Sequence, residues 1–365
     1  MLPGRRKLAE EYGVALSTVQ RAIARMLEDG TLTADGPNGT FVAQRKNGTV
    51  DPEAIRSDII SPADGPRRST LRIGIMLCEC APGESPEETE ENSFFGPLFD
   101  GIRSVLARED VYVSYLYDNG ARYDGYLRRA ECDGLIVVGP AVSELITLQQ
   151  LASENIPFVA LLNSSDASPA FTDLPCIDAD NRQGTDDALR HLVELGHKRI
   201  GIVNLSTFQT NLYDRLAAYF EALAEAGLSI CPEHVLMNSF PWDEGVFQRL
   251  IDQWVGKLVR SNRLPTAIFA CDFNMTLKTV AALQRLGVRV PDDVSVAGFD
   301  DAPVAEHLWP PLTMVRQPVY QMGRRAATRL LEHLKTSRGH LHGTERLPTQ
   351  LIVRGSTAAP RPERL

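Results

Sequence analysis

The sequence lacks the long apolar segments that would place a chain in or across a membrane. No apolar run in its 365 residues approaches the roughly 20 residues that a transmembrane helix needs. The N-terminal stretch MLPGRRKLAEEY has no apolar core of a secretory signal. A hydrophobic fraction of 43% and a charged fraction of 23% are those of a soluble globular protein. We therefore expect a cytoplasmic protein without a membrane partner.

Motifs for metal binding, disulfides and catalysis are also missing. The cysteines are scattered, and their only close pair is a C-x-C; they are Cys78, Cys80, Cys132, Cys176, Cys231 and Cys271. No glycine-rich phosphate loop, G-x-S-x-G turn or metal cluster is present. We expect free thiols, no metal, no cofactor and no catalytic residue. An α/β enzyme that uses Arg215, Asp272 and Asp300 as acid–base groups is the alternative.

Charge is unevenly distributed along the chain. Residues 1–46 hold seven Lys or Arg against five Asp or Glu, so this segment carries +2, whereas the whole chain carries -9. A small basic segment on an acidic body fits localised contact with phosphates, because electrostatic attraction acts on the nearby surface.

The first 46 residues show the order helix, turn, helix, hairpin. Residues 5–12 form a short helical segment, and Ser17 with Gln20 makes an S-x-x-Q capping box for a second helix that ends at Gly30. The apolar stripe of that helix is Val19, Ala22, Ile23, Met26 and Leu27. Extended runs at 31–35 and 40–44 then flank an Asn38-Gly39 pair, which favours a hairpin.

Residues 47–70 lack an apolar period and are expected to be a linker. Beyond them, strand-length apolar runs alternate with amphipathic helical stretches. The predicted strands are 71–77, 111–117, 134–138, 158–162, 199–203, 267–270 and 295–299. This alternation predicts an α/β fold with doubly wound parallel sheets, and its length predicts two lobes. Ligands of such sheets bind outside the carboxyl ends of the strands, so we expect a shared cleft.

The first segment resembles the winged helix-turn-helix of GntR-type regulators. The resemblance covers about 42 residues and lies in the LP-x-x-R-x-LA opening, the STV helix start and the G-T-F-V wing. It implies that the polar N-terminal residues of the recognition helix contact bases, with further contacts from the first helix and the wing. The implied DNA-binding residues are Arg6, Ser17, Thr18, Gln20, Arg21, Asn38 and Gly39.

The head departs from that pattern in two ways. Leu16 and Gln20 stand where such heads often carry arginines, so we expect a shallower dependence of DNA binding on salt. Such heads also begin with a helix before the LP motif, which here follows Met1 directly. Either the true start lies upstream or the head lacks its first helix. A helical hairpin that serves as an interaction module is the alternative interpretation.

Residues 71–357 resemble the effector-binding core of the LacI/GalR family, which is similar to periplasmic sugar-binding proteins. The motifs that carry the resemblance include NSFFGPLFDGI, DADN, HLVELGHKRIG, RLAAYFEAL, PTAIFA, RVPDDVSVAGFDDAP, PPLTMVRQP and LIVRGST. With a GntR-type head, the chain looks like arabinose-type repressors. The resemblance implies a homodimeric repressor that binds operator DNA and a small polar effector such as a sugar.

The same resemblance places the lobes and the site. We expect lobe 1 at 71–180 plus 300–318, lobe 2 at 181–299 plus 319–358, and a tail at 359–365. Arg215 and Asp300 match the residues that grip ligand hydroxyls, and Phe94 or Phe95 would supply a stacking ring. Alternatively, Asp300 caps a turn, Arg215 pairs with Glu194 or another surface acid, and one of the two phenylalanines packs inward.

Other positions leave the pocket less certain. Asp272 or Asn274 should serve after the PTAIFA strand, but CDFN has one residue more than the family pattern Asn-Asp. Leu212 and Ala218 replace a common serine and a common glycine. His197 is expected to be a structural turn residue.

The stretch 79–91 holds six glutamates and is either a solvated loop or a lid over a cationic ligand. A transport-type sugar receptor is the remaining alternative, which the DNA-binding head opposes.

Overall fold

A computed structural model describes residues 32–35, 39–42, 70–78, 94–117, 132–140, 145–162, 173–205, 210–238, 244–336 and 341–362. The chain divides into two units, Met1–Arg67 and Arg68–Leu365. In the first unit, β1 (Leu32–Asp35) pairs with β2 (Gly39–Val42) in an antiparallel hairpin. The two strands predicted here are therefore confirmed.

The helical part of the predicted head lies outside the described residues. So do six of the seven predicted DNA contacts, namely Arg6, Ser17, Thr18, Gln20, Arg21 and Asn38, whereas Gly39 is the first residue of β2. Most of the predicted linker is also outside the described residues.

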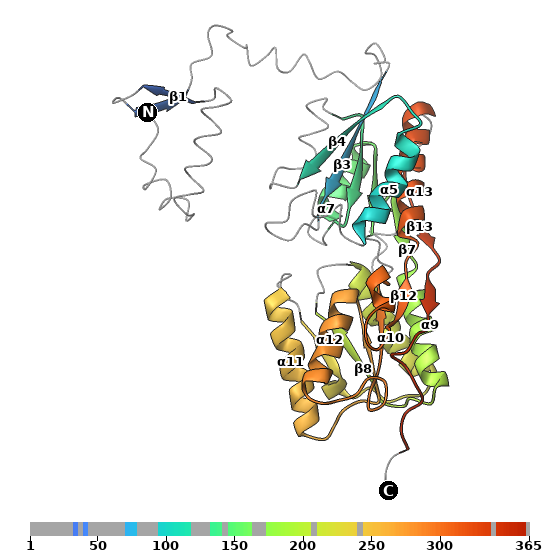
Figure 1. Cartoon of the computed structure of the whole chain (residues 1–365). Coiled ribbons are helices and arrows are strands. Elements are labelled where there is room, and N and C mark those ends of the chain that lie inside the picture. Colours follow the sequence, from blue (N-terminus) through green and yellow to red (C-terminus); the bar gives the residue numbers. More distant parts are fainter. Residues whose placement is uncertain are drawn as a thin grey trace. The chain divides into compact units, whose positions relative to one another are not determined.

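The second unit holds two six-stranded sheets, each in its own lobe (Figure 1). The lobe 1 sheet has the order β13-β7-β6-β5-β3-β4, all parallel. Its strands are β3 (Leu71–Leu77), β4 (Val111–Tyr117), β5 (Gly134–Val138), β6 (Phe158–Leu161), β7 (Cys176–Ala179) and β13 (Thr344–Leu347).

The lobe 2 sheet has the order β14-β12-β11-β10-β8-β9 and is parallel except for β14, which runs antiparallel to β12. Its strands are β8 (Ile200–Asn204), β9 (Val235–Met237), β10 (Ala267–Ala270), β11 (Ser295–Phe299), β12 (Thr313–Arg316) and β14 (Gln350–Ile352). The predicted α/β fold and all seven strands predicted from residue 71 onward are thus confirmed.

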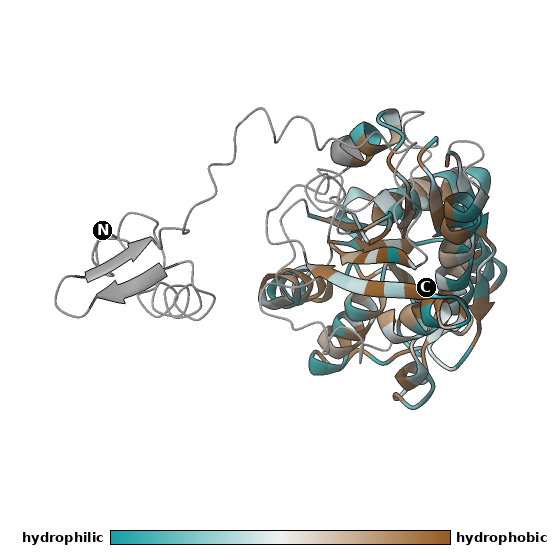
Figure 2. Ribbon diagram, turned by 90° about the horizontal axis from the view of Figure 1, so that it is seen from above, coloured by the Kyte–Doolittle hydropathy of each residue, from teal (hydrophilic) through white to brown (hydrophobic). Residues whose placement is uncertain are grey.

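Helices cover the sheets because their apolar faces pack on the strands. Lobe 1 carries α5 (Phe95–Leu106), α7 (Leu145–Ser153) and α13 (Val319–Thr336); lobe 2 carries α9 (Asn181–Glu194), α10 (Thr210–Glu225), α11 (Glu244–Arg260) and α12 (Phe273–Arg285). Apolar residues colour much of the strands brown in Figure 2, and the strands β5, β6, β10 and β11 are buried along their whole length. This burial explains their continuous apolar sequences.

The chain passes between the lobes at three crossovers. Crossover 1 leads from β7 into lobe 2 through Asp180 and the first turn of α9, which holds Asn181 and Gln183. Crossover 2 leads from β12 to α13 at Gln317, and crossover 3 leads from β13 to β14 at residues 348–349. The predicted lobe boundaries after residue 300 are therefore wrong. Strand β12 pairs with β11, so residues 300–317 belong to lobe 2, whereas α13 packs on α5 and β13 pairs with β7, so residues 319–347 belong to lobe 1.

Helices α5 and α13 approach each other through two glycines. A Cβ atom at Gly323 would lie 2.1 Å from the carbonyl oxygen of Leu98, and one at Gly101 would lie 2.1 Å from that of Tyr320. The backbones can come this close only because neither position carries a side chain. The contact therefore fixes α13 immediately after crossover 2.

We expect Gly323→Ala to lower the free energy of unfolding by about 1–3 kcal/mol, because the added methyl group meets backbone that cannot move away cheaply. Gly256→Ala in α11 is the matched control, since its Cβ would meet only the flexible end of Arg260. That variant should gain about 0.5–1 kcal/mol from lower backbone entropy of the unfolded chain. Urea unfolding measures both; equal effects would contradict the close-packing argument.

Candidate effector site

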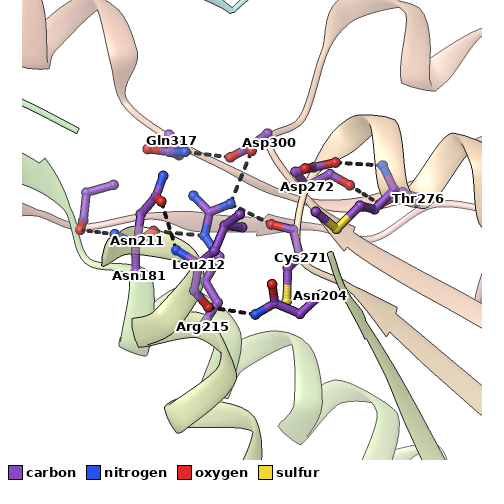
Figure 3. A network of polar contacts seen from close by, with 12 residues as sticks. Asn181, Asn204, Asn211, Leu212, Arg215, Cys271, Asp272, Thr276, Asp300 and Gln317 are labelled. Atoms are coloured by element: carbon purple, nitrogen blue, oxygen red, sulfur yellow. Dashed lines mark hydrogen bonds and ion pairs between the residues drawn. The ribbon is translucent and has the colours of Figure 1, made fainter. Parts of the chain in front are cut away.

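Polar side chains gather where the central strands of lobe 2 end (Figure 3). Cys271 and Asp272 follow β10, Asp300 follows β11, and Arg215 reaches the same place from α10. Carboxyl ends of parallel strands meet at one edge of a sheet, which is where ligands of open α/β sheets bind. The structure therefore brings together Arg215, Asp272 and Asp300, three of the residues predicted from the sequence.

Arg215 is the most constrained side chain of the site, with 1% exposure. Its Nε donates to Asn181 Oδ1 at 2.9 Å, and its Nη1 donates to the Cys271 carbonyl at 2.5 Å and to Asp300 Oδ2 at 3.1 Å. The guanidinium carbon lies 3.7 Å from the ring centroid of Phe299. Asp300, rather than Glu194 or another surface acid, is thus its ionic partner. Nη2 has no hydrogen-bond partner among the described residues.

Asp300 is held between two donors. Its Oδ2 accepts from Arg215, and its Oδ1 accepts from Gln317 Nε2 at 2.5 Å. Its φ of 69° lies in the left-handed region, which costs free energy for any residue with a Cβ and is tolerated best by Asn and Asp. The following 3-10 helix, Pro303–Glu306, has Ala302 as its N-cap and no side-chain capping bond. The carboxylate is therefore oriented toward Arg215 and Gln317, not toward a turn cap.

Two amides of the site were not predicted from the sequence. Asn181 is 3% exposed and belongs to crossover 1, whereas Gln317 is 7% exposed and belongs to crossover 2. Gln317 Oε1 is buried without a partner among the described residues. Both amides lie in the family motifs DADN and VRQP, but the motifs indicate a fold and give no reason to place these side chains in the site.

Asp272 caps α12 and also borders the site. Its Oδ1 accepts from the Met275 amide at 2.6 Å, and its backbone follows the Cys271 carbonyl that Arg215 binds. Burial raises the pKa of Asp272 to about 7, and the negative charge of Asp300 adds to the rise, while the Met275 bond opposes it. Asn274 lies in the first turn of the same helix. Its contact with the effector stays a prediction.

The two phenylalanines lie at the start of α5 in lobe 1. Phe94 is the N-cap and Phe95 the first residue, and their rings meet edge to face with centroids 5.3 Å apart. Both are partly buried against the lobe 1 core, so the packing does not separate a stacking ring from an inward one. Their role as a platform for a sugar stays a prediction.

The remaining expectations concern local shape. Leu212 and Ala218 are buried in lobe 2, and the Leu212 carbonyl accepts from Asn204 Nδ2. His197 is buried between Thr266 Oγ1 and the Ala358 carbonyl, and burial lowers the pKa of His197. These contacts fit the structural role expected for it. The acidic stretch 79–91 lies outside the described residues.

The chemistry available here is hydrogen bonding of a polar ligand. A guanidinium edge with unused donors and an amide oxygen with an unused acceptor lie beside two carboxylates. Within the described part of the chain, no three His, Cys, Asp or Glu side chains gather as metal ligands. None of the helices among these residues has the length and the apolar character that a bilayer-spanning segment needs.

Comparisons with known proteins agree with this picture. A family model for a periplasmic binding protein-like domain matches residues 189–357. The transcriptional repressor CytR of Escherichia coli K12 is 30% identical over 274 residues, which span 73% of this chain and 76% of CytR. A solved regulatory protein of the LacI family from Chloroflexus aggregans is 26% identical with a TM-score of 0.65 and covers 79% of this chain and 98% of its own. The CelR–cellobiose complex has the same fold, with 24% identity, a TM-score of 0.67, and coverage of 97% of this chain and 100% of its own.

The raised pKa of Asp272 predicts how stability depends on pH. The folded pKa of about 7 exceeds the unfolded value of 3.8, so the folded state binds this proton more tightly. Protonated Asp272 therefore makes its whole contribution to the free energy of unfolding below about pH 4, and this contribution is lost as the pH rises through 7. Asp272→Asn keeps a capping oxygen without the charge, so its advantage over the wild type should grow from pH 5 to pH 8.

Urea unfolding of both proteins across this range measures the difference. Asp180→Asn in the N-cap of α9 controls for exchanging a capping carboxylate for an amide, because Asp180 likewise accepts from a backbone amide, that of Gln183. Parallel stability curves for wild type and Asp272→Asn would contradict the assignment.

Proposed function

The chain belongs to the LacI/GalR family of transcriptional repressors, and on that premise we propose that it represses a carbohydrate-related operon under the control of a small polar effector. Its function is regulation of transcription and not catalysis. We propose that the effector binds between the lobes at Arg215 and Asp300. Asp272, Asn274 and either Phe94 or Phe95 would complete the site.

One observation carries this proposal. Arg215 Nη2 and Gln317 Oε1 are a buried donor and a buried acceptor that the described residues leave without partners. Buried polar groups are rarely left unpaired, because desolvating them without a hydrogen bond costs about 1–3 kcal/mol each. A hydroxyl group can accept from the first or donate to the second, so a ligand with several hydroxyl groups can pair both. The related CelR fold is known in complex with cellobiose.

The regulatory mechanism we propose is linkage. An effector that contacts residues near the crossovers stabilises one orientation of the two lobes over others. A differential affinity equivalent to about 1–3 kcal/mol then changes operator affinity by roughly 5- to 150-fold. Repression takes place on DNA in the cytoplasm.

For the head, we propose a GntR-type winged helix-turn-helix. The hairpin of β1 and β2 supports the wing, because its second strand begins at Gly39, the second residue of the Asn38-Gly39 pair expected there. The proposed DNA contacts are Arg6, Ser17, Thr18, Gln20, Arg21, Asn38 and Gly39, which would read operator bases and backbone.

We also propose a homodimer that presents two heads to a palindromic operator. Large apolar side chains are exposed on lobe 2: Trp309 at 87%, Val304 at 46% and Leu277 at 38%. Leu277 lies two turns before Gln284 in α12, and Gln284 Nε2 donates to the Trp309 carbonyl at 2.9 Å. An exposed tryptophan is typical of a protein interface.

The dimer proposal predicts that Trp309→Arg yields a monomer, since a charge replaces the largest apolar contact. Analytical ultracentrifugation measures the mass, and Ile230→Arg, which places the same charge at another exposed apolar position, should remain a dimer. A monomeric wild type, or a dimeric Trp309→Arg, would contradict the use of this face.

The effector proposal is tested in two steps. Thermal melting with a panel of D-ribose, cellobiose and ribonucleosides should find a ligand that stabilises the chain, by about 2.7 kcal/mol at a hundredfold excess over Kd. Electrophoretic mobility shift with the DNA upstream of its own gene should then change on adding that ligand. Arg215→Ala and Asp300→Ala should lose the response and keep DNA affinity. A chain that retards no duplex and binds no panel member is not such a regulator.

A further inference from the structure

The ion pair of the site is bonded to two of the three crossovers. Arg215 binds the crossover 1 amide Asn181, and Asp300 binds the crossover 2 amide Gln317. The chain of bonds Asn181–Arg215–Asp300–Gln317 therefore starts on one interlobe connection and ends on another (Figure 3). The two middle residues of this chain of bonds are the pair that the effector is proposed to contact.

Asn181 joins the site to the end of a lobe 1 strand. Its Oδ1 accepts from Arg215 in lobe 2, while its Nδ2 donates to Asp178 Oδ2 at 3.3 Å and to the Ala179 carbonyl at 3.2 Å. Both acceptors belong to β7. Because the amide is buried and bonded at both ends, a shift of the guanidinium cannot be absorbed by rotation of the amide into solvent.

Gln317 plays the corresponding part at crossover 2. Its Nε2 is bonded to Asp300, and two residues later α13 begins in lobe 1. Helix α13 packs tightly on α5 through Gly101 and Gly323, so its first turn has little freedom to move alone. The orientation of the Gln317 side chain is thus tied to a rigid element of the opposite lobe.

Crossover 3 is held differently. The Thr349 amide and hydroxyl both donate to Gln183 Oε1 at 3.0 Å, and the Asp180 amide donates to the Leu347 carbonyl at 2.8 Å. These bonds join crossovers 1 and 3 to each other. None of the bonds described for Gln183 reaches Arg215 or Asp300.

We propose that Asn181 and Gln317 are positioning residues that transmit the state of the Arg215–Asp300 pair to the crossovers, and that Gln183 is a crossover residue without this role. The biological meaning of the inference rests on the proposed function. Its test uses no effector, so its failure can be told apart from the failure of the effector assignment.

The test is a set of double-mutant cycles read by hydrogen–deuterium exchange of the full chain, followed by mass spectrometry. Arg215→Lys perturbs the pair, and the readout is exchange in peptides 178–184 and 316–322, which contain the Asp180 amide, bonded to the Leu347 carbonyl, and the Met322 amide, bonded to the Pro318 carbonyl. The background variants are Asn181→Ala and Gln317→Ala, with Gln183→Ala as the matched control. Asp300→Asn is the second, milder perturbation in case Arg215→Lys does not fold.

In the wild-type background, perturbing the pair should raise exchange at both peptides roughly tenfold, the ratio expected for loss of a charge-assisted hydrogen bond. In the Asn181→Ala background the same perturbation should add less than about twofold at peptide 178–184, and in the Gln317→Ala background less than about twofold at peptide 316–322, because the connection to that crossover is already broken. In the Gln183→Ala background, the full effect should persist. A purely structural role for the amides predicts additive effects in all three backgrounds, and additivity would overturn the proposal, as would unchanged exchange in the wild type.

Discussion

A buried guanidinium charge is the constraint on which the site depends. Arg215 is almost completely removed from water, and an unpaired charge there would cost far more than a folded domain can offset. The cost is offset by the carboxylate of Asp300, the Cys271 carbonyl, the Asn181 amide and the face of Phe299. These partners come from different segments, namely the residue after β10, the end of β11 with the residue that follows it, and the start of α9. Loss of any one partner leaves the charge less well compensated, so the charge favours one arrangement of the ends of these elements.

The next residue along the chain, Asp301, shows the same principle in a structural role. Its side chain is 1% exposed and is paired with Arg316 on β12 and with Arg354 in the C-terminal segment. Arg354 also donates to the Leu312 carbonyl. The two consecutive aspartates therefore bind different partners. Asp301 connects the C-terminal segment to the lobe 2 sheet, whereas Asp300 pairs with Arg215. The left-handed φ of Asp300 accompanies this change of direction between neighbouring side chains.

The periodicity of the sequence predicted the long buried strands, but it did not indicate where the chain crosses between the lobes. Continuously buried strands such as β5 and β11 have apolar sequences that predict them directly. The strands it missed have four residues or fewer, and β13, with the sequence TERL, has no apolar pattern at all. The predicted lobe boundaries after residue 300 were wrong because the sequence of an amphipathic helix such as α13 does not indicate which of two sheets the helix covers. Arg215 and Asp300 were predicted as a site because they match the residues that grip ligand hydroxyls in the family that the sequence resembles, whereas Asn181 and Gln317 matter only through contacts across the crossovers.

The two unpartnered groups of the site also bear on specificity. A ligand that merely filled the space would leave Arg215 Nη2 and Gln317 Oε1 buried without hydrogen bonds, and each would then cost about 1–3 kcal/mol. A site built to bind a hydroxyl group rejects an analogue without it more strongly than an apolar pocket rejects a missing methylene. Since Gln317 lies on a crossover, the atom that we propose discriminates among ligands is also attached to the connection between the lobes. Recognition of the correct ligand and communication between the lobes would then depend on the same hydrogen bond, so a ligand that fails to form it would bind weakly and also fail to signal.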